Sequence, residues 1–98
     1  MTTEKEITKA LEGVMDPELG LNIVDLGLIY GIEISGAKVH VKMTLTNPMC
    51  PMQSYLVGQA QEAVEKISGK GNAKVELVWE PEWNPKRLSP KARKKLGL

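Results

Sequence analysis

Cys50 is the only cysteine in this chain of 98 residues, with Pro48 two positions before it and Pro51 directly after it. Pro51 suits the first position of a helix, because a proline lacks the N–H group that would have no partner there. The sequence therefore predicts that Cys50 is the N-cap of a helix that follows a strand. Free backbone N–H groups and the helix dipole favour a thiolate at that position. A thiolate attacks electrophiles and binds soft metals, so Cys50 is the first candidate for chemistry.

Two carboxylates form a second candidate group. Asp16 and Glu18 flank Pro17 at the start of an expected helical turn, where one carboxylate can cap free N–H groups. Only one cap is needed, so the second carboxylate is surplus to the structure, and the pair could bind a metal ion or hold the proton of the Cys50 thiol. The alternatives stay open: both acids can act only as caps, and a lone cysteine is often a small, inert, buried residue.

Hydroxyl and indole groups complete the set of candidate residues. Thr44 and Thr46 lie on the polar face of the strand that leads to Cys50, so their hydroxyls can line the same site. The ordinary preference of threonine for strands explains them equally well. Trp79 and Trp83 enclose a Glu-Pro-Glu segment, which predicts either a lid over the sheet edge or plain anchoring in the core.

The spacing of apolar residues predicts the elements that position these side chains. Strands at 28–35 and 38–45 should form an antiparallel hairpin, and the strand at 73–79 should pair parallel to one of them after a helical crossover. The order α-β-β-α-β-α predicts one α+β domain over residues 1–98, a two-layer sandwich of a small three-stranded mixed sheet with helices mainly on one face. Helices are expected at 4–14, at 51–68 and from Ser89 to Gly97, with a capped turn at 16–20 and an irregular segment at 21–27.

Charge is distributed unevenly along the chain. Residues 85–98 hold six of the 13 Lys and Arg residues and no acidic residue, whereas the preceding residues carry a net charge of −5. A basic C-terminal segment of this kind can bind nucleic acid or an acidic partner. It can also be the solvated face of a helix that docks on its own acidic domain, which is the more common case.

Composition excludes some classes of protein. No apolar stretch approaches the about 20 residues that span a membrane, and the hydrophilic first residues predict no secretory signal. One cysteine cannot form an internal disulfide. We therefore expect a cytoplasmic protein that does not bind membranes.

Four segments carry a resemblance to a known family. They read DPELGLNIVDLGLIY at 16–30, TLTNPMCP at 44–51, WEPEWNP at 79–85, and LSP, AR and LG between 88 and 97. In this order and at these spacings they resemble the SufT/PaaD-like metal–sulfur cluster assembly family over nearly the whole chain. The resemblance implies a small cytosolic factor in iron–sulfur protein maturation with the α+β fold expected above.

The resemblance also implies roles for individual residues. Cys50 is the residue tied to function, and Asp16, Glu18, Thr44 and Thr46 should lie near it. Relatives often carry Thr or Ser at the position of Asn47, so here the amide replaces that hydroxyl or the hydroxyl is not needed. The branch that acts in phenylacetate oxygenase maturation carries extra C-terminal cysteines of zinc-site type. This chain has none of them, so that role and a structural zinc are not expected.

The number of ligands limits what the chain can hold. An iron–sulfur cluster needs about four thiolate or imidazole ligands, and this chain has one cysteine and one histidine, His40. We expect no stable cofactor, and at most a transient cluster or iron bound through Cys50, alone or between two chains of a homodimer. The expected partners are an iron–sulfur scaffold or carrier and client apoproteins, and an adaptor that binds clients without a cluster is a further option.

Two other classes of function would use the same residues. A thiol enzyme would use Cys50 as nucleophile with Asp16 or Glu18 as acid or base, but such enzymes usually pair the thiol with a histidine, and no such pairing is visible. A nucleic-acid-binding module would use the basic segment, but aromatic residues are not interleaved with its basic residues. The sequence thus favours an assembly, carrier or adaptor protein over an enzyme.

Overall fold

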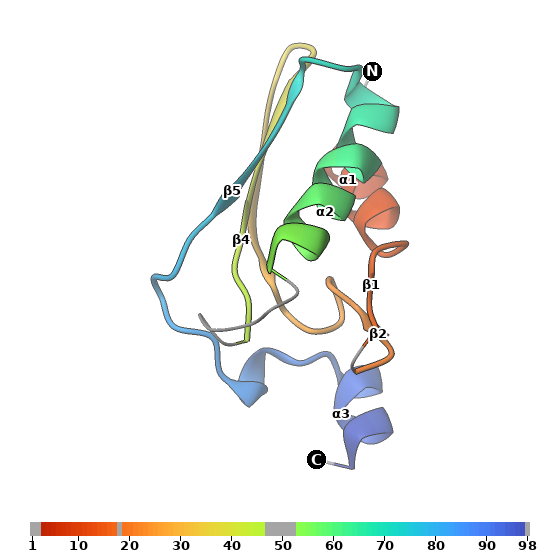
Figure 1. Ribbon diagram of the computed structural model, residues 1–98, viewed down its shortest axis with the longest axis vertical. Helices are drawn as coiled ribbons and strands as arrows, with labels where there is room; N and C mark the ends of the chain where they lie inside the picture. Colours follow the sequence, from red (N-terminus) through yellow and green to blue (C-terminus); the bar gives the residue numbers. More distant parts are fainter. Residues whose placement is uncertain (1–2, 18, 47–52, 98) are drawn as a thin grey trace.

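The computed structural model describes residues 3–17, 19–46 and 53–97, which form two layers (Figure 1). Two helices pack on one face of a three-stranded sheet, and within the described residues no helix covers its other face. This arrangement confirms the predicted α+β sandwich. The sheet contains β3 (Ile29–Ser35), β4 (Lys38–Met43) and β5 (Ala73–Leu77) in the order β3-β4-β5, and the helices are α1 (Glu4–Leu11) and α2 (Gln53–Ser68).

The strand pairing follows the prediction. β3 and β4 pair antiparallel around Gly36, whose φ of 61° a glycine adopts without strain. β5 pairs parallel to β4 after the α2 crossover, with Val41 opposite Val75. Alternation along β4 directs Val39, Val41 and Met43 toward the helices, where all three side chains are buried.

Both long helices are built as their sequences indicate. Glu6 N–H donates to the Thr3 hydroxyl oxygen (3.2 Å), which is the N-cap of α1. Spacing by three and four residues places the buried side chains of each helix on one stripe: Ile7 and Leu11 in α1, and Leu56, Ala60 and Val64 in α2. None of the described helices is long and apolar enough to cross a membrane.

Several predicted bounds were too long. α1 ends at Leu11 instead of residue 14, because Val14 N–H turns back to the Leu11 carbonyl (3.0 Å). β4 ends at Met43 instead of residue 45, since Thr44 N–H donates to the Leu28 carbonyl (2.8 Å) outside the strand ladder. β5 ends at Leu77 instead of residue 79, as the chain leaves the sheet toward the prolines of the next segment.

A short hairpin was missed. β1 (Met15–Asp16) and β2 (Leu21–Asn22) pair antiparallel on either side of the predicted turn, where the sequence indicated an irregular segment. Ile23 N–H donates to the Val14 carbonyl (3.0 Å) directly beyond this pairing. Strands of two residues are too short to show an alternating pattern, so only the folded chain reveals them.

A β-bulge changes the direction of one side chain. Alternation predicts Tyr30 on the same face as Ile32 and Ile34, but the register shifts between Ile29 and Gly31. Ile32 and Ile34 still pack against the core, whereas the ring of Tyr30 lies under the Arg87 guanidinium, 4.5 Å from its carbon. Bulges commonly re-aim a side chain in this way.

The C-terminal segment docks on the domain. It contains η1 (Pro85–Arg87) and α3 (Pro90–Leu96), and α3 lies beside β1 and β2 (Figure 1). Ser89 caps α3 by accepting a hydrogen bond from Ala92 N–H (3.1 Å), and Gly97 closes it with a φ of 76°, as predicted. Leu88 and Ala92 are buried, so apolar contact holds the segment in place.

Candidate functional site

Asp16 is a largely buried carboxylate in a surface turn. Its side chain is only 6% exposed, although the neighbouring Pro17 and Leu19 are exposed. Its Oδ1 accepts a hydrogen bond from Leu19 N–H (3.2 Å), and its carbonyl accepts one from Gly20 N–H (2.8 Å). The predicted capped turn is therefore present and closes the β1–β2 hairpin. Because buried carboxylates are rare in proteins, this position also fits a role beyond capping.

The two threonines have different surroundings. Thr44 is only 1% exposed, while Thr46 is exposed. The polar–apolar alternation of β4 stops at Met43, and both Thr44 and Leu45 turn inward. Thr44 thus lies at the buried end of the strand, and Thr46 lies on the surface beyond it.

A series of backbone hydrogen bonds joins the Asp16 turn to the end of β4. Thr44 N–H donates to the Leu28 carbonyl (2.8 Å), and Leu28 N–H donates to the Ile23 carbonyl (3.1 Å). Ile23 N–H in turn donates to the carbonyl of Val14, two residues before Asp16 (3.0 Å). The segment after the Asp16 turn thus returns to the sheet beside the end of β4.

Three predicted site residues lie outside the described residues: Glu18, Asn47 and Cys50. The predicted N-cap position of Cys50 lies outside them as well. The described chain ends on either side of Cys50 are Thr46, just past β4, and Gln53, the first residue of α2. A role for these three residues stays a prediction.

The sequence analysis missed a second functional part of the motif at 16–30, namely the polar pair Asn22 and Asp25. Two hydrogen bonds of 2.8 Å join Asn22 and Asp25. The Asn22 side-chain amide donates to the Asp25 carboxylate, and Asp25 N–H donates to the Asn22 side-chain oxygen. The Asp25 carbonyl then accepts a hydrogen bond from Ser89 N–H (2.8 Å), and the Leu26 carbonyl accepts one from the Trp83 indole N–H (2.7 Å). The polar pair at 22 and 25, three residues apart in an apolar stretch, was the available signal.

Gly27 allows the closest approach between these segments. Its φ is 73°, and a Cβ atom at this position would collide with the backbone of Arg87. Together with the Trp83 hydrogen bond, this contact makes residues 22–27 the platform on which the C-terminal segment docks. Trp83 therefore anchors the C-terminal segment to the domain through its indole N–H. Trp79, by contrast, is 39% exposed.

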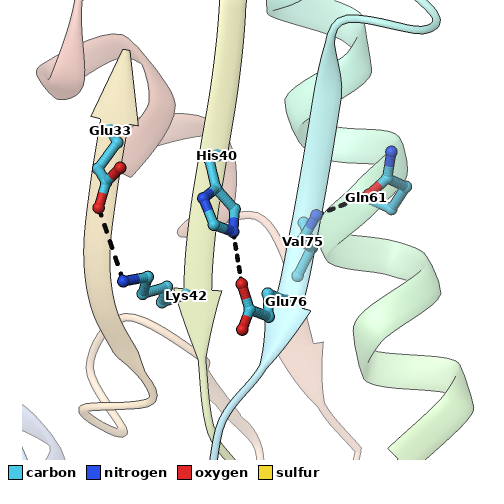
Figure 2. Close-up of polar contacts among 6 residues, drawn as sticks. All are labelled: Glu33, His40, Lys42, Gln61, Val75 and Glu76. Atoms are coloured by element: carbon cyan, nitrogen blue, oxygen red, sulfur yellow. Dashed lines mark hydrogen bonds and ion pairs between the residues drawn. The ribbon is translucent and has the colours of Figure 1, made fainter. Parts of the chain in front are cut away.

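The open face of the sheet carries ion pairs (Figure 2). His40 Nε2 lies 2.8 Å from Glu76 Oε1, and Lys42 Nζ lies 3.7 Å from Glu33 Oε1. His40 is therefore engaged on this face. In the part of the chain that the structure describes, no group of three or more His, Cys, Asp or Glu residues could hold a metal ion.

Comparison with known proteins assigns the family. Residues 4–77 match the family described as "Iron-sulfur cluster assembly protein". Over 99 residues the chain is 39% identical to an Fe-S protein maturation auxiliary factor of Porphyromonas gingivalis, covering all of this chain and 94% of that protein. It is 37% identical to the Fe-S protein maturation auxiliary factor SufT of Staphylococcus aureus, over 87% of this chain and 98% of that protein. An iron-sulfur cluster carrier protein of Synechocystis is 30% identical over 99% of this chain, which spans only 27% of the carrier.

Solved structures agree with the fold. A conserved hypothetical protein of Thermotoga maritima has a TM-score of 0.85 and 45% identity, covering 99% of this chain and 96% of that one. A domain of unknown function from Bacillus anthracis has a TM-score of 0.90 and 33% identity, covering 97% and 92%. The family match and the relatives confirm the resemblance seen in the sequence motifs. This chain belongs to the iron–sulfur cluster assembly protein family.

Proposed function

We propose that this chain is an auxiliary factor in iron–sulfur protein maturation and that Cys50 is a transient ligand of the iron or cluster that it hands over. The observation that carries the proposal is the hydrogen-bonded path that brings the turn with the buried Asp16 beside the strand end leading to Cys50. Relatives named as maturation auxiliary factors and as a cluster carrier support it.

Ligand chemistry defines how such a handover would work. One cysteine supplies one of the about four ligands that a cluster needs, so the donor, a small thiol or a second chain must supply the others. Cys50 would displace one thiolate of a scaffold or carrier, and a client thiolate would then displace Cys50, with no change in oxidation state. Asp16 and Glu18 would offer hard oxygen ligands to iron, and Thr44, Thr46 and Asn47 would donate hydrogen bonds to the sulfur ligands.

The same residues favour a non-catalytic role. A thiol enzyme needs a base beside its nucleophile, and the chain's single histidine is paired with Glu76 on the open face of the sheet. The expected partners are a scaffold or carrier and client apoproteins, and a homodimer is one way to bring two thiolates together. A cytoplasmic location stays a prediction.

Replacement of Cys50 tests the proposal. Cys50→Ala and Cys50→Ser are expressed in a strain that lacks the native counterpart, and the activities of its iron–sulfur enzymes are measured. We expect both variants to keep the melting temperature of the wild type and to restore no activity, while the matched control Ser54→Ala restores it fully. Full restoration by Cys50→Ala would reject the ligand role and leave the adaptor role, in which the chain binds clients without a cluster.

A further inference from the structure

Six cationic residues are exposed on the C-terminal segment and are together called here the basic surface. All six residues are exposed, and residues 85–98 contain no acidic residue. The ion pairs found among the described residues are elsewhere, between His40 and Glu76 and between Lys42 and Glu33. No described ion pair thus neutralises the charge of the basic surface. Its members are Lys86, Arg87, Lys91, Arg93, Lys94 and Lys95.

The segment that carries this surface is held by contacts that do not depend on its net charge. Leu88 and Ala92 are 5% and 0% exposed, and Ser89 N–H donates to the Asp25 carbonyl (2.8 Å). Arg93 donates from its guanidinium to the Lys86 carbonyl (2.7 Å), which holds α3 and η1 together. The cations are therefore presented on a fixed backbone.

The concentration of like charge is unfavourable for α3 itself. Lys91 lies three and four positions before Lys94 and Lys95, where like charges repel by about 0.2–0.5 kcal/mol per pair. The first turn of α3 contains no acidic residue, although acids there would stabilise the helix dipole. The three cations in the last turn of α3 favour the helix dipole, whereas Lys91 in the first turn opposes it. Helix stability therefore explains only part of this composition, and attraction of a negatively charged partner accounts for the rest.

The basic surface borders the candidate site. Lys95 Nζ donates to the carbonyl of Gly20 (2.8 Å), the last residue of the turn that Asp16 caps. Arg87 lies over the ring of Tyr30, close to where the C-terminal segment meets Gly27. A partner bound to the basic surface would therefore lie next to the Asp16 turn.

We infer that the basic surface docks an acidic apoprotein, the client that receives the iron–sulfur cargo, and orients it toward the candidate site. This inference rests on the proposed function. The net charge of −5 on the preceding residues repels an acidic partner elsewhere, so docking is directed to this end. Membrane insertion does not fit, because the apolar residues Leu88 and Ala92 are buried in the domain. Nucleic acid fits poorly, since the segment interleaves no aromatic residue with its basic ones.

Charge reversal tests this docking with the full chain and no iron or sulfide. The probe is a plant-type apo-ferredoxin chosen for a strongly negative net charge, titrated at about 0.05 M and about 0.5 M salt, because salt screens exposed charges. We expect the wild type to bind, and Lys91→Glu/Lys94→Glu to weaken binding about tenfold or more at low salt. The control Lys5→Glu/Lys9→Glu changes the net charge equally on α1 and should stay within about twofold. No binding by the wild type, or equal loss in both pairs of substitutions, would overturn the inference.

Three further measurements distinguish docking of an acidic protein from unfolding of the variant, from binding of nucleic acid and from failure of the proposed function. Lys91→Glu places an acid in the first turn of α3, where it favours the helix dipole, so α3 should persist. If the charge-reversed variant nevertheless unfolds, Lys91→Gln/Lys94→Gln provides the same test with a smaller expected loss of binding. A short DNA duplex that displaces the apo-ferredoxin from the wild type at about 0.15 M salt would overturn the inference in favour of nucleic acid. Cys50→Ala should dock as tightly as the wild type. Cluster transfer by Cys50→Ala would reject the proposed function and leave the docking inference, whereas transfer by a variant that does not dock would reject the docking inference and leave the proposed function.

Discussion

Asp16 has two roles that a single substitution can separate. Its Oδ1 caps the turn through Leu19 N–H, and an asparagine can make the same hydrogen bond, but only a carboxylate brings a charge to the site. We expect Asp16→Asn to keep the free energy of unfolding within about 1 kcal/mol of the wild type while it lowers client-enzyme activity in the complemented strain. Urea unfolding and enzyme assays measure the two effects. A fully active Asp16→Asn would mean that this residue only caps the turn.

Gly27 is the residue on which docking of the C-terminal segment depends most directly. An alanine there must adopt a φ of 73° and collides with the backbone of Arg87, so we expect Gly27→Ala to lose about 3 kcal/mol of stability. Trypsin should also cleave faster among the basic residues 86–95. Gly36→Ala is the matched control, because its φ is 61° but nothing lies within 4 Å of the added Cβ, and about 1 kcal/mol is expected. Equal losses at both glycines would contradict the close packing at Gly27.

At the scale of elements, Gln61 protects the free edge of the sheet. β5 is an edge strand, and the Gln61 side chain accepts a hydrogen bond from Val75 N–H (3.0 Å; Figure 2). The same side chain donates to the Ala73 carbonyl (2.7 Å), so it pairs with the edge as a further strand would. We expect Gln61→Leu to lower the free energy of unfolding by about 1–2 kcal/mol and to cause self-association through the exposed edge. Urea unfolding and sedimentation check both effects.

The control for this element is Gln59→Leu, which adds the same apolar side chain at an exposed position of α2. It should leave both the stability and the oligomeric state unchanged. Association of both variants to the same degree would show that added surface hydrophobicity, and not the loss of the edge hydrogen bonds, is responsible.

The sequence predicted those elements whose apolar periodicity and capping residues lie within one continuous segment of the chain. The β3–β4 hairpin, the parallel β5 and the ends of α3 at Ser89 and Gly97 were found because periodicity and caps lie within each segment. The β1–β2 pairing and the bulge at Tyr30 were missed, because they depend on partners that the local pattern does not contain.

The same limit applies to the candidate site. Asp16 could be placed in a capped turn from its own neighbours, and that turn is present. The platform at Asn22 and Asp25 was not recognised, because the polar pair signals a local turn but not its contact with Ser89, far along the chain. Thr44 lies at the buried end of β4 and not on its polar face, since the strand ends at Met43, two residues earlier than predicted.

At the scale of the whole molecule, the described parts of the sequence motifs gather at one end. Figure 1 shows α3 beside β1 and β2 at the end opposite the turn between β3 and β4. The same end holds the close of β4 and the docking contacts of the C-terminal segment. The layers of sheet and helix thus form a scaffold, and its motif-bearing end would meet both the donor and the client.

Anaerobic reconstitution is the most direct measurement of transient cluster binding. Wild type and Cys50→Ser are incubated with iron, sulfide and a small thiol, and visible absorbance and molecular size are recorded before and after an apoprotein client is added. We predict that the wild type gains the absorbance of a thiolate-bound cluster and loses it to the client, and that Cys50→Ser, equally folded, gains none. A Cys50→Ser variant that loads and transfers a cluster as well as the wild type would contradict the proposed role of this chain.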